Sequence, residues 1–245
     1  MWNKALTLLT ALLMLVLAGC VKDGGVCLSS AGKATTVERK LGSFEKMDVD
    51  RNIEIEFYPN STENRVEVTG GKNLVDGCTT EVRENTLYIT NTNKCNWLRD
   101  YRRKIKMKVY CTAISQLRFS GSADFTCMDT LRTDVFTFLG WDGSGDVRMK
   151  LEVKEAYIKL NTGTSDVYLS GKSDLLYYYS LTTGYIYGRD FITREGHVEQ
   201  SGYGDFHISP SIALKGTITR SGNVYCPQGI PTDISISGSG NLVNY

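Results

Sequence analysis

The C-terminal half of the sequence repeats a short glycine-containing turn at a period of about 20 residues, which is typical of solenoid proteins. The first glycines of these turns are Gly121, Gly143, Gly163, Gly184, Gly202, Gly222 and Gly238. The residue before each glycine is Ser, Thr or Asp, whose short side chains close turns by hydrogen bonding to nearby backbone groups. A chain that turns at such regular intervals is expected to stack its repeats as the coils of a solenoid.

An apolar residue follows each turn and defines a column of inward side chains. The column contains Phe125, Val147, Val167, Ile186, Phe206, Val224 and Leu242. The glycine lies four positions before the apolar residue in five repeats and two positions before it in the repeats of Gly184 and Gly222. A difference of two positions keeps the side chain on the same face of a pleated strand. Asp or Asn directly precedes every apolar residue except Ile186, which follows Tyr185.

A second column of expected core residues lies between the turns. Phe136, Ala156 and Tyr177 recur at nearly the same interval as the turns, and Phe138, Ile158 and Tyr179 recur in step with them. Amphipathic helical periodicity is almost absent after the N-terminal segment. We therefore predict an all-β chain that forms a right-handed parallel β-helix, a three-sided solenoid of about 20 residues per coil.

An N-terminal β-hairpin region is expected to precede the repeats. The segment TTEVRENTLYIT (79–90) reads as a hairpin with its turn near Asn85 and Thr86. If Glu84 faces Leu87, then Cys78 and Cys95 lie nearly opposite each other at the open end, and a disulfide between them is expected. The pairing of Cys27, Cys111, Cys127 and Cys226 stays open.

The segment 1–19 has the features of a lipoprotein signal peptide. An apolar run from Ala5 to Leu17, broken only by Thr7 and Thr10, ends in Leu17-Ala18-Gly19-Cys20. This resembles a bacterial lipobox, which implies cleavage before Cys20 and its acylation. We expect a signal peptide over 1–19, a lipidated tether over 20–40 and a solenoid domain over 41–245. The predicted location is the outer membrane, on its periplasmic side or at the cell surface, with the acyl chains in the bilayer.

The charge balance gives no support for a nucleic-acid partner. The chain has 28 basic and 27 acidic residues, and removal of Lys4 with the signal peptide leaves 27 of each. The sequence therefore predicts no general electrostatic partner. It does not define an oligomeric state.

Two chemical interpretations of the repeated turns compete with a structural one. The Asp and Asn residues could bind a metal ion, or two stacked carboxylates could cleave glycosides, but no repeat is distinguished from the others as a site would be. Asp and Asn close solenoid corners by bonding to the backbone. We expect no catalytic residue, no metal site and no cofactor. A glycan-active β-helix enzyme, such as a polysaccharide lyase or glycosidase, remains the alternative.

The order of parts resembles one known family. The lipobox, FEKMDVDRNIEIEF, NRVEVTGGKNLVDGCTTEVRENTLYITN, KIKMKVYCTAISQLRFSGSADF and the Ser-Gly repeats follow one another as in the putative auto-transporter adhesin head GIN domain of Bacteroidetes-type bacteria. The resemblance covers residues 44–245 and implies a right-handed β-solenoid without a catalytic motif. The expected function is a binding, adhesion or structural module of the cell envelope, with a glycan or protein ligand on the solenoid face. Candidate exposed aromatic binding residues are Trp97, Trp141 and Tyr203.

Overall fold

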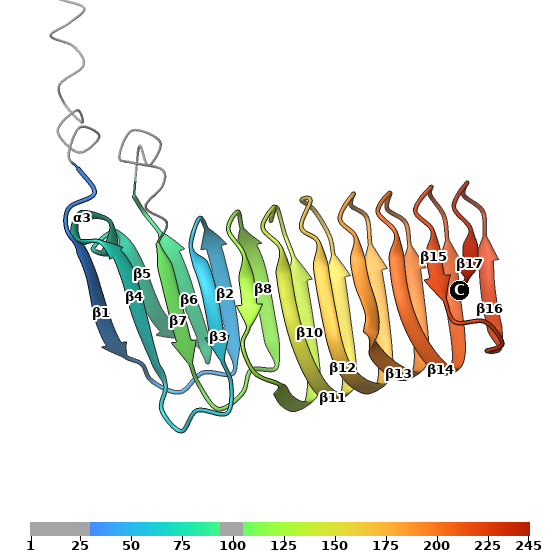
Figure 1. The fold of residues 1–245 in the computed structure, drawn as a ribbon, viewed down its shortest axis with the longest axis horizontal. Helices are drawn as coiled ribbons and strands as arrows, with labels where there is room; N and C mark the ends of the chain where they lie inside the picture. The colour runs from blue at the N-terminus through green and yellow to red at the C-terminus, as the bar shows by residue number, and fades with distance from the viewer. Residues whose placement is uncertain (1–29, 94–104) are drawn as a thin grey trace, which may run out of the picture.

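The computed structural model describes residues 30–93 and 105–245, which form a β-solenoid of about six turns with about 20 residues per turn. Strands account for 63% of the described residues and helix for 2%. The coils lie side by side along one axis, from the blue and green N-terminal strands to the red C-terminal strands (Figure 1). The predicted all-β solenoid is therefore confirmed. In the described residues no helix is long and apolar enough to cross a bilayer.

Each coil of the C-terminal half has two strand-bearing sides, so only two of the three predicted sides carry strands. The long strands are β11 (Val147–Leu160), β12 (Val167–Ser180), β13 (Ile186–Gln200) and β14 (Phe206–Ile218). Each runs along one side, bends near its middle and returns along the other (Figure 1). We call the first half of each strand the first side and the second half the second side. Neighbouring strands pair in parallel on both sides, as Val147 with Val167 and Ile158 with Tyr178.

Shorter strands continue the two sides. β9 (Phe125–Cys127), β15 (Val224–Cys226) and β17 (Leu242–Asn244) belong to the first side, and β8 (Gln116–Gly121) and β16 (Thr232–Ile236) to the second. β10 (Leu131–Gly140) pairs with β11 on both sides of the bend. The loop from the second side to the first side of the next coil is called the corner. The corners of two coils are joined by a parallel bridge between Gly143 and Gly163.

The N-terminal strands form a coil and a cap. β2 (Lys46–Arg51) lies between β6 (Thr86–Asn91) and β8, and β3 (Glu54–Tyr58) lies between β7 (Lys106–Tyr110) and β9, all in parallel. Antiparallel strands then end the stack: β4 (Arg65–Gly71) pairs with β7 and β1 (Ala34–Lys40), and β5 (Cys78–Arg83) pairs with β6. A short helix, α3 (Lys72–Val75), connects β4 to β5. Strand β1 thus occupies the last part of the segment that the sequence assigned to the tether.

The core is filled by alternate residues of both sides. The predicted column from Phe125 to Leu242 is in register from coil to coil, and its members are buried except for the partly buried Leu242 in the last coil. Large fully buried side chains include Phe119, Phe136, Phe138 and Tyr178. Burial at about 25 cal/mol per Å² of apolar surface makes this core the main source of stability.

The corners are closed by a ladder of Asp and Asn side chains. In each case an Oδ1 atom accepts a hydrogen bond from a backbone N–H of the next coil. Asp124 accepts from Asp146 at 3.1 Å, and Asp166 accepts from Tyr185 at 2.8 Å. In the same way, Asp205 accepts from the backbone N–H of Asn223 at 2.8 Å, and Asn223 accepts from that of Asn241 at 3.0 Å. These bonds satisfy corner N–H groups that no strand pairs. The Asp and Asn residues that precede the inward column, called the Asx column, therefore bond to the corner backbone as expected.

The turn glycines occupy two different corner positions, which explains the irregular spacing in the sequence. Gly184 and Gly222 lie where a Cβ would collide with the backbone of the previous coil. Gly163, with φ of +95°, lies two positions earlier in the corner and faces Gly143. The spacing between glycine and the apolar residue is therefore shorter in the repeats of Gly184 and Gly222 because a later position of the corner carries the glycine in these two repeats.

The prediction that Tyr177 and Tyr179 fill the core is wrong. Ala156 pairs with Leu176, and Ile158 pairs with Tyr178. The second inward column therefore continues through Leu176 and Tyr178, each one position before the tyrosine that was predicted. Tyr178 is fully buried, whereas Tyr177 and Tyr179 point outward and are half-buried. A shift of one position exchanges the two faces of a strand, which is why the predicted and observed faces differ.

The turn of the hairpin formed by β5 and β6 lies one residue earlier than predicted. Arg83 pairs with Thr86, and Glu84 and Asn85 form the two-residue turn with φ of 47° and 60°. Positive φ at both positions is typical of the type I′ turn, whose twist matches the flanking strands. Cys78 consequently pairs with Asn91. Cys95 lies outside the described residues, so the Cys78–Cys95 disulfide stays a prediction.

Candidate ligand-binding groove

A column of aromatic rings lies on the outer face of the first side. Tyr168, Tyr187, His207 and Tyr225 each follow a core residue of the inward column, so strand alternation turns them outward. Their ring centroids are 4.7, 5.8 and 4.5 Å apart in sequence order, with interplanar angles of 17°, 12° and 8°. Rings so close and nearly parallel overlap in an offset stack. The four side chains form one continuous strip, the aromatic column.

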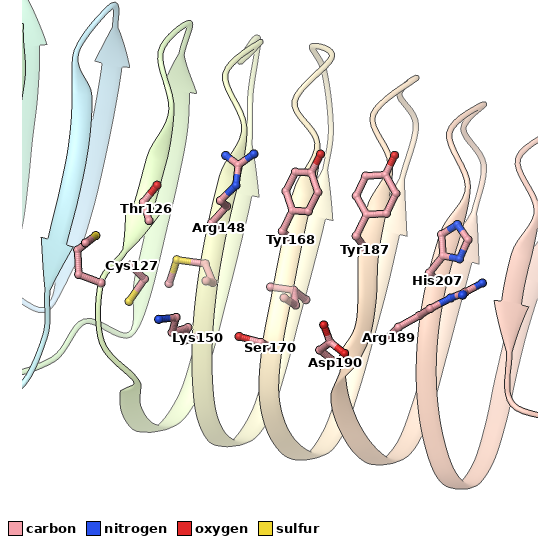
Figure 2. Close-up of a pocket in the computed structure, with 13 residues that line it drawn as sticks. Thr126, Cys127, Arg148, Lys150, Tyr168, Ser170, Tyr187, Arg189, Asp190 and His207 are labelled. Carbon is pink, nitrogen blue, oxygen red and sulfur yellow. The ribbon is translucent and has the colours of Figure 1, made fainter.

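A groove of about 660 Å³ runs beside this column. Thr126, Arg148, Tyr168, Tyr187 and His207 form one rim, one residue from each of five consecutive coils. The opposite rim is formed by Met128, Lys150, Ser170 and Asp190. Figure 2 shows both rims crossing the coils, with Tyr168 and Tyr187 next to each other. At about 4.8 Å per coil the groove extends for roughly 19 Å along the solenoid axis.

A bulge in β13 shapes the groove. Tyr168 pairs with Tyr187, but the next pair is Ser170 with Asp190, so Gly188 and Arg189 oppose the single residue Leu169. This extra residue is the mark of a β-bulge, which bends the strand and redirects side chains. The hydroxyl of Tyr178, reaching across the core from the second side, occupies the place where a Cβ of Gly188 would lie. The buried Tyr178 thus fits only a glycine at the bulge.

The charges around the groove are unevenly paired. Arg148 binds Asp146 at 2.7 Å, and its guanidinium lies 4.6 Å from the ring centroid of Tyr168. Arg189 lies 4.3 Å from the ring centroid of Tyr245, a cation–π contact. Among the described residues neither Arg189, Lys150 nor Asp190 forms an ion pair. The groove therefore holds two cations and one carboxylate that are free to meet a ligand.

The pKa values of Tyr168, Tyr187 and His207 in the aromatic column are shifted in the directions that favour the neutral rings. The pKa of Tyr168 is raised, first by burial and then by the negative charge of Asp146. The pKa of His207 is lowered, first by burial and then by the positive charge of Arg189. Within the described part of the chain, the buried Nδ1 atom of His207 has no hydrogen-bond partner. A neutral imidazole stacked between Tyr187 and Tyr225 extends the column as an uncharged ring.

A second, shorter row of rings lies on the second side. Tyr157 and Tyr177 are 6.0 Å apart, and Tyr177 and His197 are 5.3 Å apart. The Tyr157 hydroxyl donates to Glu155 at 2.8 Å, and burial followed by a hydrogen bond to Glu199 raises the pKa of Tyr177 to about 12. These hydroxyls are already bound to carboxylates of their own face. This row is a natural control for the aromatic column.

The corner carboxylates do not converge on a reactive centre. Asp124, Asp146 and Asp166 each use an oxygen in the corner ladder or in an ion pair with Arg148. No group of three or more His, Cys, Asp or Glu residues that could hold a metal ion occurs within residues 30–93 and 105–245. The geometry gives the Asx column a structural role.

The described cysteines are buried thiols. Burial raises the pKa of Cys111 to about 12 and the pKa values of Cys78 and Cys127 to about 11. Cys127 lines the groove, but its thiol donates to the Asp129 carbonyl at 3.0 Å. Because the thiolate is the nucleophilic form, these raised pKa values favour the weakly nucleophilic thiol at neutral pH.

The predicted aromatic residues lie apart from the groove. Trp141 is 38% exposed and Tyr203 is 53% exposed, but they belong to two separate corners and line no part of the groove. Tyr203 contacts Arg220, whose guanidinium donates to its hydroxyl at 3.2 Å. Cys20, the predicted lipid attachment site, and Trp97 lie outside the described residues.

The aromatic column itself was missed at the sequence level, although a signal for it exists. Tyr168, Tyr187, His207 and Tyr225 recur once per repeat and directly follow four residues of the predicted inward column. The groove has no comparable signal. It depends on the bulge at Gly188 and on the order of strands around β9.

Comparison with known protein families agrees with the fold. The model of the family described as "Putative auto-transporter adhesin, head GIN domain" matches residues 43–227. The chain belongs to this family. The expected family resemblance is thereby confirmed over most of the solenoid. A search of curated proteins finds no match.

Solved structures of bacterial proteins share the solenoid fold. A putative adhesin from Bacteroides fragilis is 20% identical, with a TM-score of 0.79 over 87% of this chain and 97% of that one. A putative lipid binding protein from Parabacteroides distasonis is 19% identical, with a TM-score of 0.66 over 86% and 97%. A putative adhesin from Parabacteroides merdae is 17% identical, with a TM-score of 0.64 over 87% and 98%. At these identities the likeness concerns the fold alone.

Proposed function

We propose that this GIN-domain protein is a lipid-anchored adhesion module of the cell envelope that binds an extended ligand without turning it over. The aromatic column beside the groove carries this proposal. Aromatic side chains give large contact area at low entropic cost and dominate binding surfaces. The groove follows the solenoid axis, so its shape suits a chain-like ligand that crosses several coils.

A glycan fits this surface better than a peptide strand does. The groove lies on the face of the first side, where β9, β11, β12, β13 and β14 each pair with a strand on either side. A peptide that adds a strand needs a free sheet edge. Recognition here must use side chains, namely rings for the flat faces of sugars and Ser170, Asp190 and Lys150 for hydroxyl groups.

The membrane anchor is the second part of the proposal. The lipobox ending at Cys20 supports acylation of that cysteine, and the adhesin family supports an exported protein of the envelope. The first described strand, β1, begins at Ala34, so the segment 21–33 separates Cys20 from the first strand. A linker of this length would hold the solenoid close to the bilayer surface.

The glycan-active enzyme remains the competing proposal because carboxylates do stack along the corners. The corner hydrogen bonds of Asp124 and Asp166 argue against it, since each bond commits one carboxylate oxygen to the backbone of the next coil. A glycan array with the chain over residues 21–245 separates the two proposals. Binding with intact glycans supports the adhesion module, whereas release of shorter products would identify an enzyme. Failure to bind any glycan or envelope protein would contradict both.

A further inference from the structure

We infer that the groove selects a linear polysaccharide that carries anionic groups at regular intervals. The inference rests on the proposed binding function of the groove and names its ligand class. The observations behind it are the two unpaired cations Lys150 and Arg189, their spacing along the solenoid axis, and the neutral rings between them.

At the bend, by contrast, cations of neighbouring coils lie beside carboxylates. At the bend, Glu152 binds both Arg132 at 3.0 Å and Lys172 at 2.6 Å. Lys154 binds Asp134 at 3.0 Å, and Arg194 lies 3.8 Å from Asp174. Each of these four cations of the bend therefore has a carboxylate partner.

The groove breaks this pattern. The register places Lys150, Ser170 and Asp190 opposite one another, so the residue that follows Lys150 in the next coil is a serine instead of a carboxylate. Lys150 is exposed and has no ion pair within the described chain. Arg189 is turned outward by the bulge and is held by the Tyr245 ring, which leaves its charge uncompensated. Among the described residues, the two unpaired cations outnumber the one unpaired carboxylate of the groove, Asp190, and this excess of positive charge attracts an anionic ligand.

The spacing of the two cations fits a polymer. Lys150 lies in the coil of β11 and Arg189 in the coil of β13, two coils apart, which corresponds to about 10 Å along the axis. Tyr168 lies in the coil between them and Tyr187 beside Arg189, so a sugar ring can rest on an aromatic ring while its acidic neighbours meet the cations. This order of charge, ring and charge suits a chain in which acidic and neutral sugars alternate.

A membrane surface is a poorer partner for the same charges. The cations lie on the rims of a groove that is hollowed between two rows of side chains, which admits a narrow chain but not a flat bilayer. Anionic lipid headgroups are nevertheless a separate outcome that the test must distinguish.

The test compares matched polysaccharides that differ only in charge. Binding of the chain over residues 21–245 is measured by calorimetry with hyaluronate, with polygalacturonate, and with the methyl ester of each. We expect at least one acid to bind and its ester to bind about tenfold more weakly, as expected for loss of one charged contact. Lys150→Gln should weaken acid binding about tenfold, whereas Lys154→Gln, an exposed lysine of the same strand, should change it less than about twofold.

Each contrary result has a distinct meaning. Equal binding of acid and ester, or no effect of Lys150→Gln, would overturn the inference while leaving the proposed glycan binding intact. Binding only to neutral glycans on the array would do the same. Absence of binding to every glycan and every envelope protein would overturn both the inference and the proposed function, whereas binding to a protein alone would overturn only the inference. Sedimentation with phosphatidylglycerol vesicles that depends on Lys150 would overturn the inference in favour of a lipid surface.

Discussion

The phenol oxygen of Tyr178 lies against Gly188, at the place where any other residue would carry its Cβ. Tyr178 enters the core from the second side, whereas Gly188 belongs to the first side of the next coil. The contact therefore crosses the whole core. It coincides with the bulge that separates Tyr187 from Asp190, and this bulge turns Arg189 toward the groove. Packing inside the solenoid thus determines the shape of its outer surface.

Replacement of Gly188 should therefore destabilise the protein. In Gly188→Ala the new methyl group meets the Tyr178 hydroxyl, and overpacking of this kind costs about 1–3 kcal/mol. Gly42→Ala is the matched control, because no atom lies within 4 Å of the Cβ that it adds. Urea unfolding gives the free energies. Equal free energies of unfolding for the two variants would contradict the prediction, because they would show that the core accommodates the added methyl group at the bulge.

The hydroxyl of Tyr178 should contribute nothing to stability. Among the described residues it is buried without a hydrogen-bond partner, and an unsatisfied buried polar group is unfavourable by about 1–3 kcal/mol. We expect Tyr178→Phe to be as stable as the wild type or more stable, and to restore part of the stability that Gly188→Ala loses. A loss of more than about 1 kcal/mol in Tyr178→Phe would mean that the hydroxyl has a partner, such as a buried water.

The corner ladder makes a prediction of its own. Asp166→Asn keeps the oxygen that accepts the Tyr185 N–H, so its stability should stay within about 0.5 kcal/mol of wild type. Asp166→Ala removes the acceptor and should cost about 1 kcal/mol, as loss of a capping side chain does in helices. Melting curves with and without Ca²⁺ complete the test. A strong dependence on Ca²⁺ that Asp166→Asn abolishes would identify a metal site at the corner.

His207 should make the stability depend on pH. Its pKa is lowered in the folded protein, mainly by burial, so the unfolded chain binds the proton more readily. The associated stability is complete above the unfolded pKa of about 6.5 and is lost as the pH falls through the folded value. The groups that face His207 are the rings of Tyr187 and Tyr225, with Arg189 lowering and Asp205 raising its pKa.

The pH effect is measured by melting temperatures of wild type and His207→Phe. The variant keeps a ring in the column but cannot titrate. Between about pH 7.5 and about pH 5.0 the wild type should lose more stability than the variant. Equal losses would show that His207 accepts a proton in the folded state without penalty.

The membrane anchor is tested independently of the fold. Cys20→Ala removes the predicted acylation site and should move the protein from the membrane fraction to the soluble fraction. Immunoblots of fractionated cells measure this, with the unaltered protein as the reference. Continued sedimentation of the variant with membranes would refute the lipid anchor.

Periodicity predicted the coils and the inward column but not the details between them. Repeats of Gly, Asx and an apolar residue are local patterns, so Val147, Val167 and Phe206 could be placed from the sequence. Tyr178 follows Ile158 in the inward column, whereas the predicted spacing placed Tyr179 there. An error of one position exchanges the inward and outward faces of a strand. Local patterns do not determine such a register.

The groove could not be predicted because it arises from long-range packing. The bulge at Gly188 exists where Tyr178 fills the core from the opposite side, and no repeat in the sequence links these two residues. The outward column could have been found, since each of its members directly follows a member of the inward column. Trp141 and Tyr203 were chosen for exposure alone, and the corners keep them away from the groove.

The central claim is that the aromatic column binds the ligand, and affinities of three variants test it most directly. Tyr168→Ala and Tyr187→Ala each remove a ring of the column, and Tyr177→Ala removes an outward ring of the second side. For the glycan bound most tightly on the array, the first two variants should lose about tenfold or more in affinity, and Tyr177→Ala less than about twofold. Equal affinities in all three variants, with melting temperatures unchanged, would contradict the assignment of the groove as the binding site.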